Sequence, residues 1–180
     1  MTPEPGLPEI PDRLSDLIRL AIDGARSLDS SVYTPSYNSW HTPFSDAKCH
    51  FCDAGAVIAA TLVPACDRYK GYLNLRPNDF PHPWKHALLA LDAAREGDVY
   101  LAYAHLGHAH CPGEPIDDTP YDTTVQDILD TLGPNGKSEY GDWDAFHVHL
   151  AWMEELTSRL DRIEPSDLPD PAIAQMPPRA

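Results

Sequence analysis

Apolar residues recur at intervals of three and four along most of the chain, which is the period of an amphipathic helix. This pattern predicts six helices, at about 11–27, 52–63, 83–96, 99–106, 124–132 and 143–163. No stretch shows the strict alternation of a half-buried strand. The sequence therefore predicts an all-α fold, a single compact domain of about six helices with long irregular connections.

Capping residues support these boundaries. Asp98 and Asp142 stand where an N-cap side chain would accept a backbone hydrogen bond. Gly97, Gly107 and Gly133 stand where helices end, so we expect a loop over 108–122. The segment CDAGAVIAATLV at 52–63 is small and apolar, and predicts a buried central helix that neighbours approach closely.

Prolines divide the chain into a body and two ends. Of 19 prolines, five stand at 165, 169, 171, 177 and 178 and four at 3, 5, 8 and 11. Since proline lacks the N–H that regular structure uses, we expect Pro-rich tails at 1–9 and 165–180 around a helical domain at 10–164.

The net charge of −15 is concentrated in one third of the chain. Residues 114–164 carry 13 acids and 3 bases, a net of −10, whereas residues 1–113 carry 13 acids and 9 bases, a net of −4. Such acidity argues against direct nucleic-acid binding through a basic face. The sequence also offers no apolar run of about 18 residues and no secretory signal, so we expect a cytoplasmic protein that does not span a membrane.

Four cysteines and nine histidines supply candidate chemistry. Cys49 and Cys52 form a C-x-x-C pair, whose spacing suits two thiolate ligands of one zinc ion. The segment HLGHAHC at 105–111 could supply the remaining ligands, so the predicted zinc site comprises Cys49, Cys52, His108, His110 and Cys111. A redox pair is disfavoured because no strand–helix context is visible, and inert buried cysteines remain the alternative.

The sequence leaves two further kinds of catalytic chemistry as alternatives. Cys52 at a helix N-terminus could act as a nucleophile if His50 or His110 served as its base. The HAH segment also superficially resembles the HxH loop of metallo-hydrolases, although its acids come late. His82 and His86 are four residues apart and could share a helix face, whereas His147 and His149 point to different faces.

An aromatic connection at 29–48 carries Tyr33, Tyr37 and Trp40. These rings would either cover the helical core as a lid or form a recognition surface, since Tyr and Trp are favoured interface anchors.

The order of WHTP at 40–43, C-x-x-C at 49–52 and AGAVIA at 54–59 resembles small uncharacterised α-helical proteins encoded by bacteriophages and prophages. The resemblance covers about 70 residues. It implies a small accessory protein in the host cytoplasm, and it implies no activity, cofactor or catalytic residue.

These observations favour an acidic interaction protein over an enzyme, because no phosphate loop, GxSxG elbow or HExxH motif is present. Its partner would be a protein with a basic surface, such as the nucleic-acid-binding face of a host defence or transcription complex, which it would inhibit by covering. The predicted contact residues are Tyr33, Tyr37, Trp40, Asp117, Asp118, Asp122, Asp127, Asp130, Asp142 and Asp144. A zinc-binding structural module, or an enzyme that uses Cys52 or a histidine-bound metal, is the alternative.

Overall fold

A computed structural model describes residues 6–37, 39–43, 48–66, 69, 74–111, 123–133 and 139–163. The predicted C-terminal tail and Asp117, Asp118 and Asp122 lie outside the described residues. Within the described part the chain is a mostly helical single domain with six helices, as predicted, if the continuous run from 53 to 65 counts as one. None of these helices combines the length and apolar character needed to cross a membrane.

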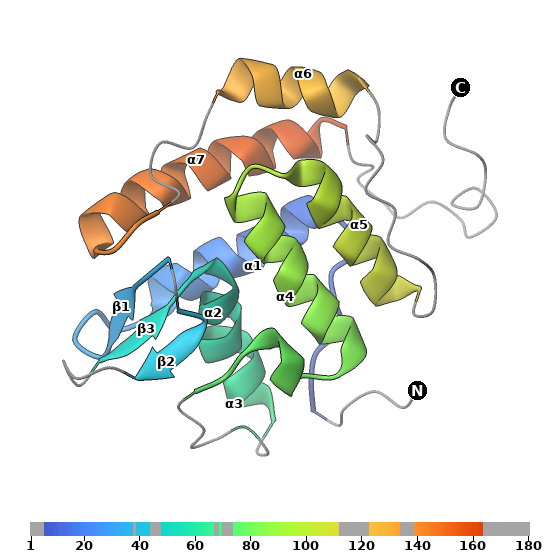
Figure 1. The fold of residues 1–180 in the computed structure, drawn as a ribbon. Coiled ribbons are helices and arrows are strands. Elements are labelled where there is room, and N and C mark those ends of the chain that lie inside the picture. The colour runs from blue at the N-terminus through green and yellow to red at the C-terminus, as the bar shows by residue number, and fades with distance from the viewer. Residues whose placement is uncertain are drawn as a thin grey trace.

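The helices follow the predicted order (Figure 1). They are α1 (Leu14–Ser27), α2 (Asp53–Val57) with a π-helical turn (Ile58–Leu62) and α3 (Val63–Ala65), α4 (His82–Arg95), α5 (Val99–His110), α6 (Thr123–Leu132) and α7 (Trp143–Asp161). A short 3₁₀ turn (Pro77–Asp79) precedes α4.

A small sheet lies where the sequence predicted only irregular chain, so that part of the prediction was wrong. Its strands are β1 (Tyr33–Pro35), β2 (His41–Pro43) and β3 (Cys49–Phe51), in the order β1-β3-β2. β1 is parallel to β3, and β2 is antiparallel to it. Strands of three residues are too short to show an alternating pattern, which is why periodicity did not reveal them.

Helix α1 lies at the centre of the domain and packs against α2 and α7 (Figure 1). Its predicted apolar stripe is buried, with Leu14, Leu17 and Ile18 fully covered. The stripe of α7 is buried as predicted too, and Asp142 caps that helix by accepting a 2.7 Å hydrogen bond from the backbone N–H of Ala145. Both faces belong to one hydrophobic core, to which α2, α4 and α5 also contribute buried residues.

Small residues allow close approach around α2, as predicted. A Cβ on Gly24 of α1 would lie 3.1 Å from the carbonyl oxygen of Ala56. A Cβ on Gly55 would lie only 1.5 Å from the carbonyl oxygen of Trp40, so no side chain fits there. The residue that precedes β2 therefore sits directly on the first turn of α2.

Helices α4 and α5 form a hairpin. The turn between them was predicted correctly, whereas the predicted C-terminal end of α5 was wrong. Gly97 adopts a positive φ of 85° after α4, and Asp98 caps α5 by accepting a 3.0 Å hydrogen bond from the N–H of Leu101. Helix α5 does not stop at Gly107, however, but continues to His110. This extension places His105 and His108 one turn apart on a single helix.

Candidate metal centre

Four histidines meet between α4 and α5. His82 and His86 lie one turn apart at the start of α4, and His105 and His108 lie one turn apart near the end of α5. Because α5 folds back along α4 after the turn at 96–98, the beginning of one helix lies beside the end of the other (Figure 1).

Three of these side chains converge on one point. A ring nitrogen from each of His82, His86 and His108 lies within 4.8 Å of the other two. The ring centroids of His86 and His108 are 4.3 Å apart, and those of His82 and His86 are 4.5 Å apart. In the part of the chain that the structure describes, this is the single group of three or more histidine, cysteine or acidic side chains that could hold a metal ion.

Two nitrogens of this group are buried without a hydrogen-bond partner: Nδ1 of His82 and Nδ1 of His108. A buried polar atom without a partner is costly, and in native proteins it usually has a specific reason. A bound cation would satisfy both nitrogens, because a neutral imidazole nitrogen is a common metal ligand.

The surroundings favour the neutral form of His82 and His86. Burial, together with the neighbouring His108 and His82, lowers the pKa of His86 to about 4. Burial and the neighbouring His108 also lower the pKa of His82. Since only an unprotonated imidazole offers a lone pair to a metal, the lowered pKa values prepare His82 and His86 to bind an ion at neutral pH.

The fourth histidine, His105, contacts the group through His86. Nδ1 of His105 lies 3.1 Å from Nδ1 of His86, and the two rings are stacked with centroids 5.4 Å apart. Burial lowers the pKa of His105 as well. Neutral His86 and His105 therefore share one proton between these two nitrogens.

Of the five zinc ligands predicted from the sequence, only His108 belongs to this group. No three of the five share a site in the described structure. Cys49 lies on β3, Cys52 precedes α2, and Cys111 is exposed at the end of α5. His110 instead places its Nε2 3.0 Å from the carbonyl oxygen of Pro11. The structure therefore does not bring the five predicted ligands together, and the group that could hold a metal ion has His108 as its one predicted member.

The C-x-x-C cysteines have the environment of inert thiols. Burial raises the pKa of Cys52 to about 12, and it raises the pKa of Cys49 to about 11. Because the thiolate is the nucleophile, a thiol held protonated in this way is a poor catalytic group. The structure therefore gives no support to Cys52 as a nucleophile.

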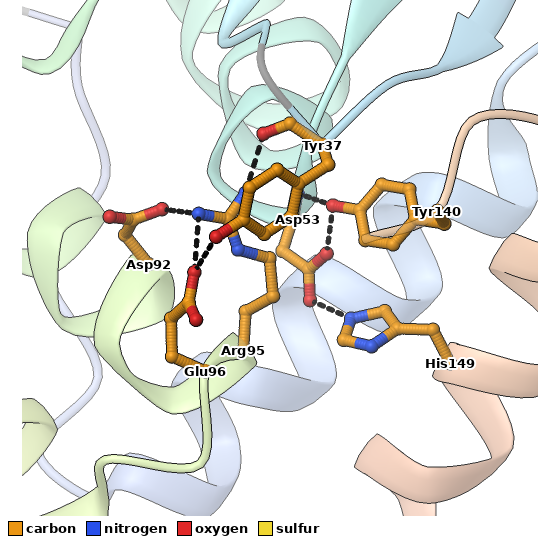
Figure 2. Close-up of polar contacts among 7 residues, drawn as sticks. All are labelled: Tyr37, Asp53, Asp92, Arg95, Glu96, Tyr140 and His149. Atoms are coloured by element: carbon orange, nitrogen blue, oxygen red, sulfur yellow. Dashed lines mark hydrogen bonds and ion pairs between the residues drawn. The ribbon is translucent and has the colours of Figure 1, made fainter. Parts of the chain in front are cut away.

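A second polar cluster lies inside the domain, where β3 meets α2 (Figure 2). The carboxylate of Asp53 accepts a 2.5 Å hydrogen bond from the hydroxyl of Tyr140 and lies 2.7 Å from Nε2 of His149. Burial alone would raise the pKa of Asp53, but His149 and the Tyr140 hydroxyl hold it below its usual value. His149 is fully buried and Asp53 is 2% exposed, so this cluster lies inside the domain and joins α2 to α7.

Arg95 extends the same cluster toward the aromatic connection (Figure 2). Its Nη1 donates a 2.9 Å hydrogen bond to the carbonyl oxygen of Tyr37, and its Nη2 pairs with Asp92. The guanidinium carbon lies 4.2 Å from the centroid of the Tyr37 ring, a cation–π contact. Arg95 thereby fixes the connection between β1 and β2 on the end of α4.

The predicted recognition rings are largely used in packing. Tyr33 meets Phe51 edge to face with centroids 6.1 Å apart, and Trp40 is half-buried against the core. Tyr37 donates its hydroxyl to Glu96. These contacts favour the lid interpretation of the aromatic connection over the recognition surface.

The predicted acidic contact residues that the structure describes are exposed: Asp127, Asp130, Asp142 and Asp144. Two of them also have structural partners. Asp142 caps α7, and Asp130 accepts a 2.8 Å hydrogen bond from the side chain of Gln126.

Sequence reasoning missed His82 and His86 as ligands, although their spacing of four residues on a predicted helix was a usable signal. It also missed the anchor formed by Asp53, Tyr140 and His149. Asp53 lies 87 positions from Tyr140 and 96 from His149, so no local pattern connects it to them.

Comparison with known proteins finds no matching protein-family model, no matching curated protein and no matching solved structure. Function is therefore inferred from the geometry of the histidine cluster.

Proposed function

We propose that this protein binds a divalent late transition-metal ion, with zinc as the first candidate, through His82, His86 and His108. One observation carries the proposal: nitrogens from three imidazoles on two helices lie within 4.8 Å of one another, and two of the imidazoles bury an unpartnered Nδ1.

The choice of metal follows from the ligand type. Imidazole nitrogen suits zinc, copper, nickel and iron, whereas calcium and magnesium prefer carboxylate, carbonyl and water oxygens. The converging group contains imidazoles alone. Zinc takes such ligands at about 2.0–2.1 Å in tetrahedral geometry, and three protein ligands leave its fourth position to water or an external ligand.

Binding at this position would join the first turn of α4 to the last turn of α5. Because the folded hairpin offers three ligands at once and the unfolded chain does not, metal binding would stabilise the fold by mass action. At a free zinc concentration of 100 times Kd, this linkage is worth about 2.7 kcal/mol, which corresponds to a rise in Tm of about 5–10 °C for a domain of this size.

The test is zinc binding by full-length protein purified without a metal-binding tag. We expect about one equivalent of zinc by elemental analysis, and competition with a chromophoric chelator should give an affinity that falls by more than about 100-fold in His86→Ala. His147→Ala is the matched control, because His147 is exposed on α7, where its ring contacts Trp143. Less than about a tenth of an equivalent in the wild-type protein, or unchanged affinity in His86→Ala, would contradict the proposal.

A second candidate function is binding of a basic protein partner by the acidic C-terminal third. Support for it comes from the exposure of Asp127, Asp130 and Asp144 on α6 and α7. The triple variant Asp127→Asn, Asp130→Asn, Asp144→Asn removes three charges and leaves Asp142 to cap α7. If this face binds, a partner captured at low salt is released at high salt and is lost from the triple variant. A partner that stays bound at high salt and also binds the triple variant would count against this second function.

A further inference from the structure

We infer that His105 is a positioning residue of the metal site, which accepts a hydrogen bond from Nδ1–H of His86 and thereby directs the bare Nε2 of His86 at the ion. This inference rests on the proposed metal binding and assigns a role to a histidine outside the ligand group.

The rings of His86 and His105 share a single proton. Nδ1 of His86 and Nδ1 of His105 are 3.1 Å apart, so one of them donates and the other accepts. A neutral imidazole carries its proton on one nitrogen and its lone pair on the other. If His105 donated, His86 would carry its own proton on Nε2 and would have no lone pair left for a metal.

Only the opposite arrangement leaves His86 able to ligate while the contact persists. With His86 as donor through Nδ1–H, its Nε2 is bare, and the bond to His105 fixes the angle of the ring. Ligand histidines of known metal sites usually donate their second ring N–H to such an outer partner, and loss of that partner typically weakens metal binding 10–100-fold.

His86 lies at the centre of the histidine cluster, so the orientation of its ring affects the whole site. Its ring contacts His82, His108 and His105, with centroids 4.5, 4.3 and 5.4 Å away. Its side chain is 8% exposed, so water competes little for its Nδ1. In His82 and His108 the unbonded nitrogen is Nδ1, which is therefore the atom that each ring leaves free for the ion. For His86, the outer hydrogen-bonding partner that the described residues show is His105.

The first test compares zinc affinity in three variants of the full-length protein by chelator competition. We expect His105→Ala to bind zinc 10–100-fold more weakly with unchanged stoichiometry. His105→Asn keeps an acceptor oxygen where Nδ1 stood, and should stay within about threefold of the wild-type protein. His110→Ala, on the same helix but bonded to Pro11, is the control and should bind normally.

The second test reads the tautomer directly and does not depend on a variant that folds. Long-range ¹H–¹⁵N correlation spectra of the metal-free protein should show His86 protonated on Nδ1 and bare on Nε2, and zinc should shift the Nε2 resonance. A proton on Nε2 of His86 would overturn the inference, as would unchanged zinc affinity in His105→Ala. A wild-type protein that binds no zinc would instead remove the proposed function, and the role of His105 in it, so the two failures are distinguishable.

Discussion

The carboxylate of Asp53 lies 2.7 Å from Nε2 of His149, and this contact joins the first residue of α2 to the middle of α7 across 96 positions of the chain. Both side chains are buried, and Tyr140 closes the cluster by donating its hydroxyl to the same carboxylate (Figure 2). The backbone N–H of Asp53 in turn donates a 3.0 Å hydrogen bond to the Tyr140 hydroxyl oxygen. Three separate segments therefore depend on one carboxylate.

Removal of that carboxylate should be strongly destabilising. Asp53→Ala removes the acceptor that the buried His149 ring and the buried Tyr140 hydroxyl share, and each buried polar group that loses its partner costs about 1–3 kcal/mol of unfolding free energy. Urea denaturation at neutral pH measures the loss. Asp130→Ala, at an exposed position of α6, should change the unfolding free energy by less than about 0.5 kcal/mol. Equal stability of the two variants would mean that the buried cluster does not anchor the fold.

Acid should weaken the same anchor. The pKa of Asp53 lies below its usual value of 3.8 in the folded protein, so as the pH falls the unfolded chain takes up the proton first. The contribution of Asp53 is thus present above about pH 4 and is lost as the pH falls through its folded-state pKa. In urea titrations at several pH values, the stability difference between wild-type protein and Asp53→Ala should shrink toward low pH. A difference that stays constant from neutral pH to about pH 3 would refute this assignment.

Two glycines in helices should respond to alanine in opposite directions. Gly55→Ala would push a Cβ into the carbonyl oxygen of Trp40, and backbone there cannot move without shifting the sheet, so we expect a loss of about 3 kcal/mol or failure to fold. Gly107→Ala on α5 meets nothing within 4 Å and should stabilise the protein by about 0.5–1 kcal/mol through helix propensity. Thermal unfolding of the two variants measures both changes in stability. A Gly55→Ala protein as stable as the wild type would disprove the close contact between Gly55 and Trp40.

The four thiols should differ sharply in reactivity. Cys111 is exposed, whereas Cys52 is 2% exposed and burial raises its pKa to about 12. A disulfide reagent added to the native protein should modify Cys111 rapidly and Cys52 only after unfolding. Cys111→Ser should remove the fast phase. Rapid modification of Cys52 in the folded protein would reopen its assignment as a nucleophile.

Much of the fold could be predicted from sequence patterns that span only a few residues. The stripes of α1 and α7, the Asp98 and Asp142 caps and the turn at Gly97 follow from helix period and capping chemistry, which act over a few residues. The sheet was missed because its strands have three residues each. The end of α5 was misplaced because glycine weakens a helix without necessarily ending it, and Gly107 here is followed by a further turn.

By itself, the sequence determined the helices, their order and the supply of histidines, because periodicity, caps and composition are local properties. Only the tertiary structure decided which histidines meet. The hairpin of α4 and α5 brings His82 and His86 to His108, whereas Cys49 lies in the sheet on β3 and Cys52 directly before α2. Ligand convergence depends on how helices pack and on where α5 ends, and neither is encoded in the spacing of the ligands along the chain.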